Sequence, residues 1–347
     1  MTVWGWLIER LAGPRRDNPE TPVPQAQGTW HVIVLDGTMS SFRKGYETNA
    51  GLIAKLAREK PYKIDVYYEP GIQYHGMSSV PKVLFGRGLG DQIRRAYGVL
   101  ASRYRPGDHI VLVGYSRGAF AVRSLAGMIH TIGLLKSTQA QPRHIRQVWR
   151  GYKGDVPIER LDVFRNHMCH TGVTIDAIAA FDTVRALGVR LPLIWRMFGD
   201  RYAFHDHHLS ACVKHAYHAL AYNETRLAYS PIKWDNDPPE GAQLLQMWFA
   251  GAHGDVGGHL SGFEAARGLS NIPLTWMIEQ LQSVGLPLPE NSIERFKIDP
   301  HAPSVGTWSG VGKWLLVRKK RIADLGEYET LHPTIEIRKT QDTPDEL

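Results

Sequence analysis

The chain has 347 residues, of which 43% are hydrophobic and 22% charged, and its formal net charge is +7. This composition excludes a disordered or fibrous chain and is typical of a globular protein that buries a large core. The positive charges are scattered except for Arg318-Lys319-Lys320-Arg321, a run that is most simply interpreted as a solvated loop. We therefore expect no nucleic-acid partner.

Neither the cysteines nor the hydrophobic pattern indicates a disulfide framework or a membrane span. Cys169 and Cys212 lack metal-ligand spacing and are compatible with a reducing compartment. The sequence contains no run of about 18 apolar residues, which a transmembrane helix requires. Its first residues do not have the pattern of a signal peptide.

Residues 1–28 are predicted to form an N-terminal segment that ends in a linker rich in proline and polar residues. Trp4, Leu7, Ile8 and Leu11 could form the apolar face of a short helix. Such a helix could dock on the body of the protein, touch a membrane surface or bind a partner.

From residue 29 to residue 288, apolar strand patterns alternate with helical patterns, which predicts an α/β fold with a mostly parallel sheet and helices on both faces. Strands are predicted at Trp30–Leu35, Ile64–Tyr68, Ile110–Val113, Val173–Phe181 and Gln243–Ala250. Helices are predicted at Asn49–Glu59, Asp91–Tyr104, Ala119–Ile129, His208–Leu220 and Asn271–Val284.

Two irregular regions, near residues 134–172 and 189–240, interrupt this alternation, and we expect them to form cap insertions. Residues 289–347 are predicted to be an irregular C-terminal extension with one short strand near Trp314–Val317. The aromatic residues of the caps suit acyl-chain binding, although such residues are equally often part of a core: Trp149, Tyr152, Phe164, Trp195, Phe198, Tyr202 and Phe204.

The sequence Gly114-Tyr115-Ser116-Arg117-Gly118 joins one predicted strand to the helix that follows it. A G-x-S-x-G motif in this setting is a nucleophile elbow, in which Gly114 and Gly118 allow a turn too tight for Cβ atoms. The turn lifts the serine hydroxyl clear of the sheet, at a helix N-terminus that stabilises developing negative charge. Ser116 is therefore the candidate nucleophile.

A serine nucleophile needs an imidazole base and an acid that orients the imidazole. On an α/β-hydrolase the chain order is Ser, then Asp or Glu, then His, and Ser116, Asp182 and His253 each follow an apolar strand in that order. The three side chains are therefore predicted to meet at one edge of the sheet. Asp255 is the alternative acid, or it holds the glycine-rich loop around His253. Asp182 could instead cap a helix, and His253 could be a loop residue bonded to backbone.

The oxyanion hole requires two backbone N–H groups near the serine. We expect one from Arg117 and the other from Gly37 or Thr38, with Asp36 orienting that loop. We expect neither a metal nor a cofactor. The glycine-rich stretch 86–90 lacks the ending of a phosphate loop. The local histidine cluster fits no common zinc pattern: His205, His207 and His208.

Several motifs, taken in order, resemble the DUF2235 family of α/β-hydrolases, the catalytic domain of Tle1-like phospholipase effectors of type VI secretion. The set covers about residues 30–285 and includes LDGT (35–38), YYEPGI (67–72), GRGLGDQIRRAY (86–97), FDTVRALG (181–188), HALAYNETR (218–226) and WFAGAHGDVGG (248–258). The resemblance implies that Ser116 is the nucleophile, His253 the base and a carboxylate the third member.

We therefore expect a serine hydrolase that cleaves a phospholipid or another lipid ester through an acyl-enzyme intermediate. The scattered basic residues would tolerate an anionic head group and contact with a membrane surface. The alternatives are a carboxylesterase for small esters and an immunity-like or binding protein that keeps the fold without the chemistry. The resemblance further implies a cytoplasmic protein of the producing bacterium, delivery by type VI secretion, and an unidentified secretion or immunity partner.

Overall fold

The computed structural model describes residues 28–38, 40, 42–43, 45–71, 88–156, 158–184, 208–235, 237–308 and 316–342. Within these ranges seven strands form one sheet in the order β2-β1-β3-β4-β5-β6-β7, and each neighbouring pair is parallel. The predicted α/β fold with a parallel sheet is confirmed. The strands are β1 (Trp30–Leu35), β2 (Ile64–Glu69), β3 (His109–Tyr115), β4 (Ile175–Phe181), β5 (Val213–Ala221), β6 (Gln243–Phe249) and β7 (Glu329–Leu331).

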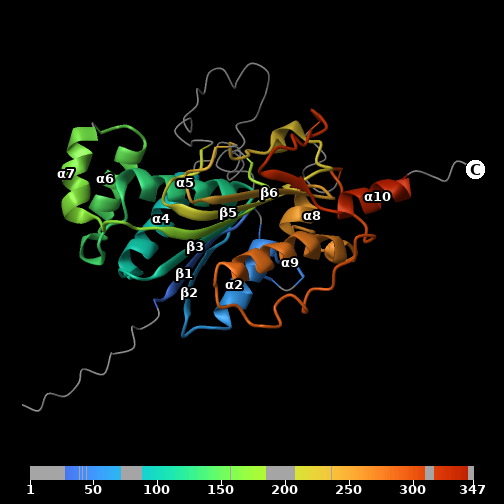
Figure 1. Cartoon of the computed structure of the whole chain (residues 1–347), viewed down its shortest axis with the longest axis horizontal. Helices are drawn as coiled ribbons and strands as arrows, with labels where there is room; N and C mark the ends of the chain where they lie inside the picture. Colours follow the sequence, from blue (N-terminus) through green and yellow to red (C-terminus); the bar gives the residue numbers. More distant parts are fainter. Residues whose placement is uncertain are drawn as a thin grey trace, which may run out of the picture.

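Helices cover both faces of the sheet, and Figure 1 shows α2 and α9 together beneath it. Ile110 and Leu112 of β3 lie in the core formed with α4 and α5, whereas Val111 and Val113 lie in the core formed with α2 and α9. A strand buried on both faces shows no polar alternation, which explains its continuous apolar run. The helices are α2 (Asn49–Arg58), α4 (Leu89–Arg103), α5 (Arg117–Ile132), α6 (Pro142–Tyr152), α7 (Ile158–Met168), α8 (His253–Gly257), α9 (Arg267–Ser283) and α10 (Thr334–Asp342).

The helix predicted at His208–Leu220 is wrong, because Val213–Ala221 forms β5 in the interior of the sheet, between β4 and β6. Six consecutive residues at the end of this strand are buried, so the strand has no period-two pattern. Its alanines also favour a helix on intrinsic propensity, which tertiary packing overrides here. Part of the expected second insertion is therefore sheet, and residues 185–207, with their four aromatic residues, lie outside the described ranges.

The first insertion forms α6 and α7, and α6 packs on α4 and α5. Figure 1 places α6 and α7 at the end of the molecule opposite α8, which begins at His253. Phe164 is buried in the core on the α4–α5 side, and Trp149 and Tyr152 pack against that core. The described part of this insertion therefore thickens one flank of the protein and does not cover the ends of the strands near His253.

The C-terminal extension contributes to the sheet, because Glu329–Leu331 pairs with β6 as strand β7. The strand predicted near Trp314–Val317 is not found at Leu316 and Val317, and residues 309–315 are outside the described ranges. The N-terminal segment, residues 1–27, is outside them as well. Among the helices that are described, none has both the length and the hydropathy needed to cross a membrane.

Candidate active site

Ser116 lies at the sharp turn between β3 and α5, with φ 58° and ψ −120°, a backbone conformation that non-glycine residues rarely adopt. Its N–H donates to Phe181 O at 2.9 Å, so β4 supports the turn. A Cβ on Gly118 would lie 1.9 Å from Leu35 O, and one on Gly114 would lie 2.6 Å from the backbone of Ala119. The two glycines are therefore required by the close approach of β1 and α5.

Ser116, His253 and Asp182 form a chain of hydrogen bonds at the carboxyl ends of β3, β6 and β4. The Ser116 Oγ–His253 Nε2 distance is 2.9 Å, and the His253 Nδ1–Asp182 Oδ2 distance is 2.5 Å. An ionised carboxylate can only accept a hydrogen bond, so the imidazole donates from Nδ1 and accepts at Nε2. All three residues are buried, Asp182 completely.

The imidazole of His253 is held more firmly than a glycine-rich loop would hold it, because His253 is the first residue of helix α8. Its ring stacks on Tyr229 at a centroid distance of 4.7 Å and lies 4.9 Å from the Tyr115 ring. Its backbone N–H donates to Glu224 Oε2 at 3.2 Å. Arg226 in turn binds both carboxylate oxygens of Glu224.

Asp182 has further partners that keep it ionised. Arg321 donates to both of its oxygens, at 2.6 and 3.0 Å, and the Ala221 N–H donates to Oδ1 at 3.0 Å. Burial opposes ionisation, but the charge of Arg321 and the hydrogen bond from His253 outweigh it and hold the pKa of Asp182 well below its usual value. A carboxylate in this state can stabilise an imidazolium.

Asp255, the alternative acid, binds groups other than the imidazole. Its Oδ2 accepts from the Ala252 N–H at 2.8 Å and from Ser304 Oγ at 2.5 Å, and its Oδ1 accepts from the Val305 N–H at 2.8 Å. Asp255 thus joins the start of α8 to the C-terminal extension. The geometry brings Asp182 rather than Asp255 to His253.

The loop after β1 lies beside the elbow because β1 and β3 are neighbours in the sheet. The buried carboxylate of Asp36 accepts from the Gly37 N–H at 2.7 Å, from Thr48 Oγ1 at 2.7 Å and from the Tyr68 hydroxyl at 2.8 Å. These contacts tie the loop to the N-cap of α2 and to β2. Since the Gly37 N–H is occupied by Asp36, the Thr38 N–H is the better candidate of the two for an oxyanion donor.

Five contributors to the site were not identified from the sequence: Glu224, Arg226, Arg321, Tyr229 and His218. His218 Nε2 accepts from the Thr183 N–H at 3.1 Å and so pins the turn that carries Asp182. Burial lowers the pKa of His218 to about 3, which keeps the imidazole neutral and able to accept. The basic run that contains Arg321 was visible in the sequence, but no local pattern distinguishes an arginine that folds back onto an acid from a solvated one.

The structure describes only part of the histidine cluster for which the sequence predicts no metal site. His208 is exposed and its Nδ1 lies 3.1 Å from Asp235 Oδ2, while His205 and His207 are outside the described ranges. Where the structure is described, no group of three or more His, Cys, Asp or Glu residues is arranged to hold a metal ion.

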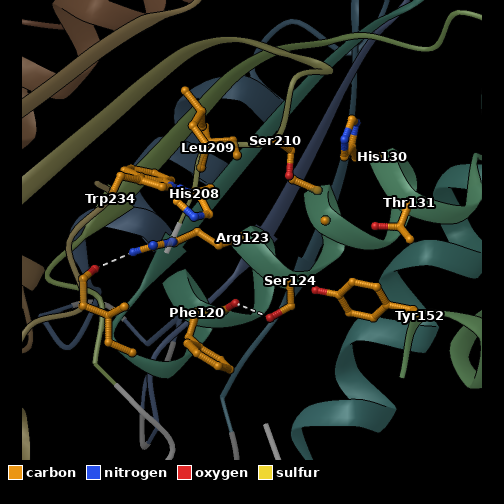
Figure 2. A pocket seen from close by; sticks show the side chains of 14 residues that line it. Phe120, Arg123, Ser124, His130, Thr131, Tyr152, His208, Leu209, Ser210 and Trp234 are labelled. Carbon is orange, nitrogen blue, oxygen red and sulfur yellow. Dashed lines mark hydrogen bonds between the residues drawn. The ribbon is translucent and has the colours of Figure 1, made fainter. Parts of the chain in front are cut away.

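A pocket of about 220 Å³ lies along α5 and does not include the three hydrogen-bonded residues. Figure 2 shows Arg123 pointing across it toward Trp234, and the guanidinium lies 4.2 Å from that ring. Arg123 also donates to the carbonyls of Ile232 and Lys233. Arg123 is therefore held in the pocket wall by neighbouring residues. Because the pocket lacks the hydrogen-bonded Ser116, His253 and Asp182, we place the candidate active site at Ser116.

The chain is similar to one protein family and to a yeast protein. A family model described as "T6SS, Phospholipase effector Tle1-like, catalytic domain" matches residues 30–280. An uncharacterized Saccharomyces cerevisiae protein, YEL023C, is 30% identical over 157 residues, which are 41% of this chain and 22% of the yeast protein.

Two solved structures are similar at low identity. An uncharacterized protein from Pseudomonas aeruginosa has a TM-score of 0.44 and 14% identity, covering 83% of this chain and 52% of that one. The Tle1 effector bound to the VgrG spike of the type 6 secretion system has a TM-score of 0.35 and 17% identity, covering 67% and 51%. The chain spans about half the length of these two proteins and less of the yeast protein.

Proposed function

Because the chain belongs to the Tle1-like catalytic-domain family of type VI secretion phospholipase effectors, we propose that it is a serine hydrolase that cleaves a lipid ester through an acyl-enzyme intermediate. The observation that carries this proposal is the unbroken series of hydrogen bonds from Ser116 through His253 to Asp182. A binding protein has no need for these three groups in contact at a strained turn.

In the proposed reaction His253 Nε2 takes the proton of Ser116 as its Oγ attacks the ester carbonyl. The backbone N–H groups of Arg117 and Thr38 donate to the oxyanion. His253 then gives its proton to the departing alcohol, and the acyl group remains on Ser116. A water molecule, deprotonated by the same imidazole, releases the carboxylic acid and restores the serine.

The C-terminal segment 316–325, which we name the strap, supports a lipid substrate. Leu316 is 71%, Val317 63% and Ile322 79% exposed, and exposed Lys319 and Lys320 lie between them in the chain. Exposed apolar residues interleaved with lysines suit the surface of an anionic bilayer. Because the strap also carries Arg321, this surface lies close to the proposed acid.

Hydrolysis of anionic phospholipid vesicles and of a soluble short-chain ester tests the proposal. We expect the wild-type protein to release fatty acid from vesicles and Ser116→Ala to release none. Ser124→Ala is a matched control, because Ser124 lies on α5 and its hydroxyl only donates to Phe120 O within the helix. Turnover of the soluble ester alone would favour a small-ester carboxylesterase, and turnover of neither substrate would favour a binding protein.

Membership in an effector family further leads us to propose delivery by type VI secretion, with a partner in that system. Comparing the protein in culture supernatants of secretion-competent and secretion-deficient cells tests this. Equal amounts in both supernatants would contradict it.

A further inference from the structure

Arg321 lies outside the stretch matched by the family model, yet its guanidinium reaches the candidate site. Nη1 donates to Asp182 Oδ1 at 2.6 Å and Nη2 donates to Oδ2 at 3.0 Å. The same nitrogens donate to Ala221 O at 2.7 Å and to Tyr229 O at 2.5 Å. This fork fixes the plane of a carboxylate in a way that a lysine ammonium does not.

The strap is tied down on both sides of Arg321. Before it, Val317 O accepts from the Leu227 N–H at 3.0 Å, and the Lys319 N–H donates to Thr225 O at 2.7 Å. After it, the chain enters β7, which pairs with β6. The Arg321 side chain is only 6% exposed, so this cation has been taken out of water and placed against Asp182.

We propose that Arg321 is a positioning residue for the proposed triad: it holds the carboxylate of Asp182 in the orientation that presents Oδ2 to His253 Nδ1. This inference rests on the proposed function. It makes the active site dependent on a segment that follows the family-matched stretch, because the acid is oriented only when the strap is docked.

The second effect of Arg321 is electrostatic. Glu224 and Arg226 neutralise each other, and burial lowers the pKa of His259 and His218, so both imidazoles stay neutral. Among the residues that the structure describes, Arg321 is then the cation that balances Asp182. Within the described ranges, the titratable and charged groups facing the Asp182–His253 pair, other than Arg321, are Tyr115, His218, Glu224, Arg226, Tyr229 and His259.

Removing this cation leaves one uncompensated negative charge, so the Asp182–His253 pair must bind a proton more tightly. Activity requires the pair without that extra proton. We therefore expect Arg321→Gln to shift the acid limb of the kcat/KM profile upward by about one to two pH units. Arg321→Lys keeps the charge and should leave the limb in place while lowering kcat through the lost fork.

The test compares wild type, Arg321→Gln, Arg321→Lys and Arg338→Gln on a soluble ester. Arg338 is the matched control, because it lies in the same extension and its guanidinium donates to the carbonyls of Pro300 and Ala302 rather than to Asp182. We expect a roughly tenfold or larger loss of kcat in Arg321→Gln at the pH optimum, a smaller loss in Arg321→Lys, and no shift of the limb in Arg338→Gln.

The titration of the Asp182–His253 pair, followed by NMR of the His253 ring in a Ser116→Ala background, gives a readout without catalysis. An upward shift on adding Arg321→Gln supports the inference even if the proposed function fails. If the wild-type protein hydrolyses esters but Arg321→Gln keeps its kcat, its acid limb and its NMR titration, the inference is overturned. Melting temperatures show whether the variants fold. If Arg321→Gln does not fold, the kcat of Arg321→Lys still tests whether the two-pronged contact of Arg321 with Asp182 is needed.

Discussion

The burial of His218 should make the protein less stable at acid pH, and this loss of stability can be measured without an activity assay. The side chain is fully buried in β5, where Nε2 accepts from the Thr183 N–H and Nδ1 lies 3.3 Å from Gln246 Oε1. Only a neutral imidazole can accept at Nε2. Burial lowers the pKa of His218 from 6.5 to about 3, with a smaller contribution from the charge of Arg123.

Between these two values the unfolded chain binds a proton at His218 and the folded chain does not. The free energy of unfolding must therefore decrease as the pH falls below 6.5, and it continues to decrease until the folded pKa is reached. A pH of 5 lies about 1.5 units below the pKa of the imidazole in the unfolded chain, and each unit corresponds to about 1.4 kcal/mol of stability. His218 alone should thus cost about 2 kcal/mol of stability at pH 5 relative to pH 7.5.

Urea unfolding of wild type and His218→Gln at pH 5 and pH 7.5 measures this effect. The glutamine can accept from the Thr183 N–H but does not titrate, so we expect the variant to lose about 2 kcal/mol less than wild type on acidification. All other titrating groups contribute to both proteins, and the difference isolates His218. Parallel stability–pH curves for the two proteins would show that His218 does not cause the loss of stability at acid pH.

Three further predictions concern the elbow, the acid and the strap. Gly118→Ala should abolish activity and lower the melting temperature, because its Cβ would meet Leu35 O at 1.9 Å; an active, equally stable variant would contradict the tight turn. Asp182→Asn should lower kcat by about 10⁴-fold through the wrong imidazole tautomer. Asp255→Asn should mainly lower stability, by about 1–3 kcal/mol. A greater loss of kcat in Asp255→Asn than in Asp182→Asn would make Asp255 the acid. Leu316→Ser with Ile322→Ser should slow vesicle hydrolysis more than soluble-ester hydrolysis, and equal slowing would exclude an interfacial role for the strap.

Local sequence patterns were sufficient for the part of the fold that carries the elbow. The apolar runs of β1, β3 and β4 are followed directly by Asp36, Ser116 and Asp182, and His253 comes shortly after β6. Parallel strands bring these ends to one edge of the sheet. The order of Ser116, Asp182 and His253 along the chain then predicted a contact that the hydrogen bonds now describe. The choice between Asp182 and Asp255 could not be made from the sequence, since it depends on which way two nearby carboxylates point.

The elements that the sequence did not reveal depend on long-range packing. The sequence of β5 is rich in alanine and histidine and has no period-two pattern, because the strand is buried on both faces. It therefore resembles a helix until its neighbours β4 and β6 are known. The three-residue β7 is too short to show a pattern. Arg321 is 139 residues from Asp182 in the chain, and its burial follows from the docking of the strap. Charge runs carry no information about which member turns inward.

The most direct measurement is labelling of the folded protein with a fluorophosphonate probe, followed by mass spectrometric mapping of the adduct. We expect one adduct on Ser116, no labelling in Ser116→Ala, strongly reduced labelling in His253→Ala and unchanged labelling in Ser124→Ala. A folded wild-type protein that remains unlabelled, or that carries the adduct on another serine, would contradict the assignment of Ser116 as the nucleophile.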